Sequence, residues 1–419
     1  MKTRYLILPF LQVFILTCLL AEAQTEVSLP ADFSEKAYSD VQDLVNFGLR
    51  NAGTKSEQQT VNYLLDFYKG LKLQAEVDTF GFDYFSAGSV LVFCNGTTIP
   101  YTGIYIDPYK GSQDFSAEVY SITSGRQRSK IPDDSIRGRI VFTDKQFELY
   151  RLIRCRPLAI AVFNEVDLAK PSFKQARIKV TGQVQKKRSF NVSCSLNPGK
   201  KKEILVGAHW DSFCGPGADD NASGVSVLME LSRFFTAYTG SLPYTVKVIF
   251  FGAEELGLLG SKAYTDKHIR DTSSTVYYFN LDSVGDTGAV ILDVITGRRG
   301  ICLEPVTDTL RACHDFKNSW TLLDPLSTEI VYESEIPSWL NTALEQTLKS
   351  SHHEYRRVRY CGSDHNSFAN KGFITLHMGM DGNNVQHCPA DNIKQVSKAS
   401  LELSGKIAAG LIINAMMQQ

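Results

Sequence analysis

The spacing of apolar residues divides the chain into three kinds of pattern. Apolar positions recur at helical spacing over residues 32–74, which predicts helices there. Over about residues 80–188, short apolar and aromatic runs alternate with Gly, Pro, Asp and Ser turns, a pattern typical of a small β-rich module. From residue 190 onward, strands such as 203–208 alternate with amphipathic helices such as 223–235. This alternation predicts an α/β fold in which helices cover both faces of a central mixed sheet.

The first residues have the pattern of a secretory signal peptide. Lys2 and Arg4 precede an apolar run that ends at Leu20, and Ala21-Glu22-Ala23 matches a small-residue cleavage site. An uncleaved signal anchor is the alternative, but the run is short for a membrane span. We therefore expect cleavage after Ala23, a secreted or extracytoplasmic protein, and no membrane contact in the mature form.

Charge and cysteine content narrow the function classes. The 44 basic and 45 acidic residues give a net charge of −1, whereas a protein that binds nucleic acid by neutralising phosphates needs a basic excess. Cleavage would remove Cys18 and leave eight of the nine cysteines, and an even number in an exported chain suggests disulfide bonds. Cys302 and Cys313 are close enough in sequence for a local bridge, and buried free thiols are the alternative.

Acidic residues and a histidine follow the predicted strands at the point where each strand ends. In chain order they are His209 and Asp211, then Asp219 and Asp220 in a loop before a helix, then Glu254 and Glu255, then Asp282. In an α/β sheet, ligands bind beyond the carboxyl ends of the strands, so these groups should converge. Such convergence is costly unless a cation lies at the centre, and imidazole with carboxylates suits zinc.

The segments that carry these residues resemble the clan MH di-zinc exopeptidases, which include secreted leucyl-type aminopeptidases, glutamate carboxypeptidases and glutaminyl cyclases. The resemblance covers about residues 32–80 and 190–415. Its motifs, in order, are His209-Trp-Asp211, Gly217-Ala-Asp219-Asp220-Asn221-Ala-Ser223-Gly224, Gly252-Ala-Glu254-Glu255-Leu-Gly257 and Asn280-Leu-Asp282. The resemblance implies a zinc exopeptidase fold, two zinc ions per chain and peptide substrates.

The resemblance also implies a role for each residue of the site. The expected zinc ligands are His209, Asp220, Glu255, Asp282 and His387, with Asp220 bridging both ions. Asp211 would form a hydrogen bond with the far nitrogen of the His209 ring, and Glu254 would be the general base.

Spacing alone does not separate His365 from His387 as the last ligand. The family ligand lies in an H-x-x-x-D segment shortly before the last helix, which matches His387. The segment Ser363-Asp364-His365 would then line the substrate pocket. Tyr360, just before that segment, would help to hold the oxyanion.

We therefore expect a signal peptide (1–23), an N-terminal helical part of the catalytic domain (24–80), an inserted β-rich module (81–189) and a zinc peptidase catalytic domain (190–419). The module loosely resembles a protease-associated domain, and we expect it to cover the active cleft and restrict substrate length. A packing or interaction role is the alternative.

The expected function is that of a secreted zinc-dependent metallopeptidase, an aminopeptidase that removes N-terminal residues from peptides. A glutaminyl-peptide cyclotransferase is one alternative, although the peptidase-like continuation from Glu255 to Ser261 and the full ligand set argue against it. A carboxypeptidase that uses Arg356, Arg357 and Arg359 is another. A non-catalytic receptor would have lost ligands, and none of the five is missing.

Overall fold

The structure is a computed structural model. It describes residues 27–101, 103–106, 112–122, 133–143, 157–163, 173–213, 215–238, 242–269, 275–296, 319–321, 338–340, 342–343, 355–357, 362–382, 386–387 and 389–417. The predicted signal peptide, Tyr360 and the Cys302 and Cys313 pair lie outside these residues. In the described part of the chain, no helix combines the length and the apolar character needed to cross a bilayer.

A mixed sheet forms the centre of the protein. Strands β9 (Thr245–Phe251), β8 (Glu203–His209), β10 (Thr275–Leu281) and β14 (Ile374–Asp381) are adjacent and parallel. Antiparallel strands β7 (Gln175–Leu196) and β11 (Ala289–Thr296) flank them, and β13 (Tyr355–Arg357) pairs with β11. Because the four parallel strands run the same way, their carboxyl ends lie along one edge of the sheet.

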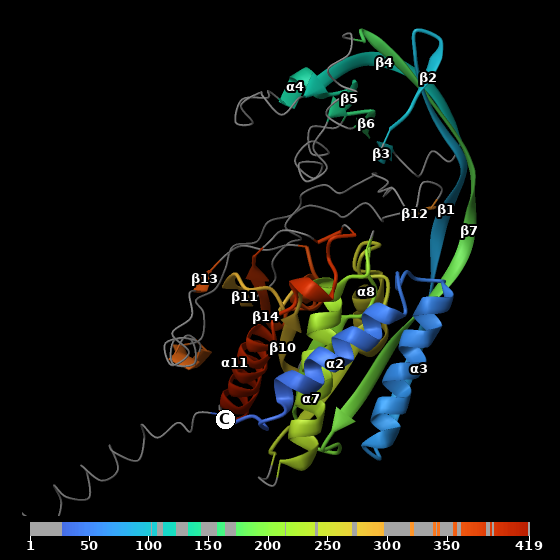
Figure 1. The fold of residues 1–419 in the computed structure, drawn as a ribbon. Coiled ribbons are helices and arrows are strands. Elements are labelled where there is room, and N and C mark those ends of the chain that lie inside the picture. The colour runs from blue at the N-terminus through green and yellow to red at the C-terminus, as the bar shows by residue number, and fades with distance from the viewer. Residues whose placement is uncertain are drawn as a thin grey trace, which may run out of the picture.

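Helices cover both faces of this sheet, as the alternating pattern predicts (Figure 1). On one face lie α2 (Phe33–Asn46), α3 (Lys55–Gly70), α7 (Gly224–Ala237) and α11 (Lys398–Met417), which share a core with Ile204 and Val206 of β8. On the other face, α8 (Leu259–His268) and α10 (His365–Ala369) pack with Leu205 of the same strand. The alternation of Ile204, Leu205 and Val206 between two cores follows from the two-residue period of a strand.

The β-rich part of the chain is joined to the sheet by a long two-stranded ribbon (Figure 1). Strand β1 (Ala75–Cys94) pairs antiparallel with β7 from Ala75 opposite Cys194 to Phe93 opposite Arg177. At the far end lie β2 (Thr97–Ile99), β3 (Gly103–Ile106), β4 (Gln113–Ile122), α4 (Asp133–Ile136), β5 (Ile140–Thr143) and β6 (Ala159–Val162). These elements have apolar clusters of their own.

The ribbon bears on two predictions made from the sequence. The expected module boundaries, after residues 80 and 189, fall inside β1 and β7, which run through them without a break. Cys94 and Cys194, on these strands, are buried free thiols. The other six cysteines expected in the mature chain lie outside the described residues. Strand β12 (Ser319–Thr321) pairs with β1 at Tyr84, Phe85 and Ser86, near the middle of the ribbon.

Candidate metal centre and active site

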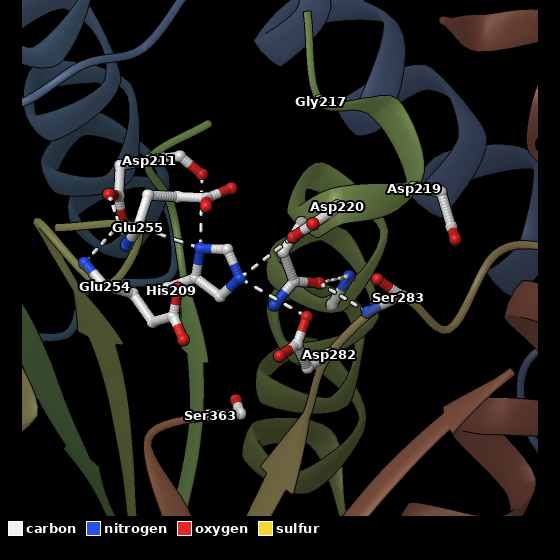
Figure 2. A network of polar contacts seen from close by, with 12 residues as sticks. His209, Asp211, Gly217, Asp219, Asp220, Glu254, Glu255, Asp282, Ser283 and Ser363 are labelled. Carbon is white, nitrogen blue, oxygen red and sulfur yellow. Dashed lines mark hydrogen bonds and ion pairs between the residues drawn. The ribbon is translucent and has the colours of Figure 1, made fainter. Parts of the chain in front are cut away.

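Three of the expected zinc ligands form a buried group beyond the carboxyl ends of the strands (Figure 2). His209 is the last residue of β8, Asp282 directly follows β10, and Asp220 lies in the turn η4 (Ala218–Ser223) before α7. The Nε2 atom of His209 lies 3.2 Å from Asp220 Oδ1 and 3.3 Å from Asp282 Oδ1. The strand ends therefore bring together groups that are 73 residues apart in the sequence.

The second group shares Asp220 with the first. The Nε2 atom of His387 lies 3.2 Å from Asp220 Oδ2 and 3.0 Å from Glu255 Oε2. In each group, one ligand atom from every member lies within 4.8 Å of the others. The His387 side chain is 31% exposed, whereas the His209 side chain of the first group is 1% exposed, so the second group lies nearer to the solvent.

The donor atoms of both groups fit divalent cations of the zinc type. Each group has one imidazole nitrogen and two carboxylates, the harder and borderline ligands that zinc accepts. Burial alone would lower the pKa of His209, but the carboxylates around it, with Glu254 and Asp282 foremost, raise it well above its ordinary value. Positive charge is therefore favoured at the centre of the cluster.

The acidic members respond to this environment in opposite ways. Burial raises the pKa of Glu255 to about 7. Burial would also raise the pKa of Asp220, but the contacts with His209 and His387 hold it well below its ordinary value. Asp220 is the carboxylate that both groups share. Its contacts with the two histidines favour the ionised form, which is the form that a bridging ligand requires.

Asp211 fixes the turn that carries Glu254 and Glu255. Its Oδ1 atom accepts a hydrogen bond from the backbone N–H of Glu254 at 3.0 Å, and its Oδ2 atom accepts one from Glu255 at 3.1 Å. The Nδ1 atom of His209 lies 3.2 Å from the Asp211 carbonyl oxygen and 3.5 Å from its Oδ1. Asp211 thus contacts the far nitrogen of the imidazole and also holds the turn of Glu254 and Glu255, a contact that the sequence did not predict.

Glu254 lies beside the cluster without belonging to either ligand group (Figure 2). Its side chain is buried, and this burial raises the pKa of its carboxyl group well above its ordinary value. A carboxyl group with a raised pKa that lies next to a candidate metal centre is suited to accept and return protons.

Ser363, Asp364 and His365 are fully buried near the end of β10. The Ser363 Oγ atom accepts a hydrogen bond of 2.7 Å from the Asn280 side chain, and burial raises the pKa of Asp364 to about 7. The His365 ring lies 4.8 Å from that of His377, between ring centroids. Within the described residues, His387 and not His365 is a member of a candidate metal group.

Asn221, next to Asp220, has a structural role that the sequence analysis missed. Its side chain donates to the Leu281 carbonyl oxygen at 2.9 Å and accepts from the Gly224 N–H at 2.9 Å. It therefore ties the turn that carries Asp220 to the end of β10, next to Asp282. The only signal in the sequence was its place in the motif Asp219-Asp220-Asn221.

The profile of peptidase family M28 matches residues 191–412, more than half of the chain. The chain belongs to peptidase family M28. The matched residues include all five expected ligands of this M28 chain.

Individual relatives agree with this assignment. Aminopeptidase YwaD of Bacillus subtilis (strain 168) is 27% identical over 296 residues, which is 60% of this chain and 62% of the relative. The chain thus matches less than two thirds of the length of that relative.

Solved structures share the fold. An aminopeptidase from Aneurinibacillus sp. strain AM-1 has a TM-score of 0.63 at 22% identity, covering 91% of this chain and 93% of the other. A zinc aminopeptidase from Bacillus subtilis has a TM-score of 0.63 at 21% identity, covering 93% and 96%. The expected mixed sheet between helices is therefore confirmed.

Proposed function

We propose that this chain is a secreted aminopeptidase that holds two zinc ions and releases N-terminal residues from peptides. One observation carries the proposal: Asp220 lies between two imidazole–carboxylate groups, with Glu254 beside them. The M28 family, and relatives named as aminopeptidases, support the peptidase chemistry. In this proposal His209 and Asp282 would hold one ion, Glu255 and His387 would hold the other, and Asp220 would be shared by both.

Bound zinc would supply Lewis acidity, which lowers the pKa of a water and polarises the scissile carbonyl. Glu254 accepts the proton of the attacking water and then delivers it to the leaving amine. Asp211 holds the backbone of Glu254 through its N–H group, which keeps this residue beside the metal groups. Ser363, Asp364 and His365 line the substrate side, and we assign Tyr360 to stabilising the oxyanion.

The test is to measure bound metal and hydrolysis rates on the same preparation. We expect two zinc ions per chain, hydrolysis of amino-acid amides with a free α-amine, and loss of the rate on chelation. N-terminally acetylated amides should resist hydrolysis. Release of only C-terminal residues would instead indicate a carboxypeptidase. Cyclisation of N-terminal Gln without hydrolysis would indicate a cyclotransferase.

We further propose that the chain is exported by cleavage after Ala23. Mass spectrometry of the protein recovered from the medium or periplasm of an expressing cell should give a chain that begins at Gln24. A chain that keeps residues 1–23 would contradict cleavage.

We also propose that the module over residues 81–189 restricts substrate length. The module beyond the middle of the ribbon can be deleted without changing the register of β1 and β7, because Ala87 of β1 lies opposite Gly182 of β7. Replacing residues 87–182 with Asn-Gly should close the ribbon as a two-residue hairpin and keep the pairing with β12. We expect rates on long peptides to rise relative to those on dipeptides. An unchanged ratio would contradict the restriction.

A further inference from the structure

Arg50 is a buried arginine between α2 and α3, with its whole side chain inaccessible to solvent. The side chain donates four hydrogen bonds, and all four go to backbone carbonyl oxygens, those of Leu44, Trp210, Pro216 and Gly217. Burying a guanidinium group is costly unless its donors are satisfied and acidic groups lie near. Asp391, Asp211 and Asp220 supply that negative environment.

The guanidinium group links two segments that carry metal-site residues. Its Nε atom lies 2.7 Å from the carbonyl oxygen of Trp210, the residue after His209. Its Nη1 and Nη2 atoms lie 2.5 Å and 2.9 Å from the carbonyl oxygens of Pro216 and Gly217. The planar fork of arginine can satisfy several carbonyl groups in fixed directions, which a lysine ammonium group cannot reproduce.

Asp391 contacts the same loop from its amide side. Its carboxylate accepts hydrogen bonds from the backbone N–H groups of Asp219 at 2.8 Å and Asp220 at 3.0 Å. Asp391 is itself buried and follows His387 by four residues. It therefore ties the loop that carries Asp220 to the segment that carries His387.

This loop needs such partners because its backbone is irregular. Gly217 has a φ of 59°, and Asp220 has a φ of −107° and a ψ of 91°, which are not helical values. A Cβ atom at position 217 would lie 2.4 Å from the Asp220 carbonyl oxygen and 3.1 Å from Arg50 Nη2. Only glycine allows the loop to approach the guanidinium group so closely.

We propose that Arg50 and Asp391 are positioning residues that hold the loop from its carbonyl and amide sides and so fix the Asp220 carboxylate between the two metal groups. This inference rests on the proposed two-metal function. Neither residue contacts substrate in this scheme, and both act through the backbone of residues 216–220.

The test compares Arg50→Lys with Arg177→Lys. Arg177 is a matched control, because it makes two hydrogen bonds of 2.6 Å to Asp114 at an exposed site in the β-rich module. The full-length mature protein would be titrated with zinc against a chromophoric chelator, and the d–d spectrum of its cobalt form recorded. We expect Arg50→Lys to weaken zinc binding by about 10- to 100-fold and to change the cobalt spectrum. Arg177→Lys should match the wild type in both measurements.

Asp391→Asn provides a second, independent variant in case Arg50→Lys does not fold. Its amide nitrogen would face one of the two backbone N–H groups that the carboxylate accepts from, so we expect the same weakening of zinc binding. The metal-free proteins would be checked by circular dichroism. A folded Arg50→Lys or Asp391→Asn variant with wild-type zinc affinity and an unchanged cobalt spectrum would overturn the positioning role. Wild-type protein that binds no zinc would instead refute the proposed function, and the positioning role with it.

Discussion

Replacing Glu254 with glutamine separates proton transfer from metal binding. The substitution keeps the size and shape of a buried side chain, and the Glu254 N–H bond to Asp211 is a backbone bond that the variant retains. Because Glu254 belongs to neither candidate metal group, we expect two zinc ions per chain in Glu254→Gln. The amide cannot accept the proton of the attacking water, so turnover should fall.

The expected fall in turnover follows from the role of Glu254 as general base. A general base contributes about 10²- to 10⁴-fold to the rate, which corresponds to about 2.7–5.4 kcal/mol of transition-state stabilisation. The assay is kcat on leucine p-nitroanilide, with bound metal measured on the same sample by mass spectrometry. The loss should appear in kcat, because the interaction is made during the reaction and not in substrate binding.

Glu255→Gln is the matched control, since it makes the same chemical change one residue away. Glu255 contacts His387 in the second metal group, so this variant should lose zinc as well as activity. Full activity in Glu254→Gln would refute the general-base role. Loss of zinc from Glu254→Gln, with retention in Glu255→Gln, would show that the two roles are reversed.

Three further predictions concern stability. Chelation should lower the melting temperature, because zinc at 100 times its Kd contributes about 2.7 kcal/mol per site, or roughly 3 °C per site for a chain of this length, and zinc but not magnesium should restore it. Gly224→Ala should destabilise the folded protein by about 1–3 kcal/mol, because its Cβ would lie 2.4 Å from Asn221 Oδ1. Gly70→Ala is the control, because its Cβ would have nothing within 4 Å and should leave the stability unchanged. Equal melting temperatures for the two variants would contradict this prediction. Burial raises the pKa of Glu57 from 4.5 to about 7, so the folded state binds the extra proton and stability should fall as the pH rises between these values. In Glu57→Gln that slope should be shallower, and an unchanged slope in thermal unfolding would contradict the assignment.

The sequence predicted the parts of the site that depend on strand ends. His209 ends β8, and Glu255 and Asp282 come shortly after β9 and β10, and parallel strands place such residues at one edge. Asp220 was predicted from a Gly-rich loop before a helix. The choice between His365 and His387 needed the family resemblance, because their spacing in the sequence does not define their distance from Asp220.

The ribbon and the Arg50 contacts could not be predicted in the same way. Strands β1 and β7 pair residues that are about a hundred positions apart. The pattern of apolar and turn residues changes near residues 80 and 189, but neither position is the end of a strand. Arg50 binds backbone carbonyl groups, which every residue has, so its partners leave no side-chain pattern. Such contacts become visible only when the chain is folded.

The ribbon also bears on how this protein could diversify. Gly88 is the extra residue of an irregularity in β1, and beyond it β1 and β7 still pair as far as Phe93 and Arg177. A hairpin tolerates added chain at its tip, because the strands below keep their register. The edge of the sheet that carries the candidate metal groups lies at the other end of the ribbon from this module (Figure 1). Evolution could therefore enlarge, exchange or trim the distal module while the chemistry below it stayed the same.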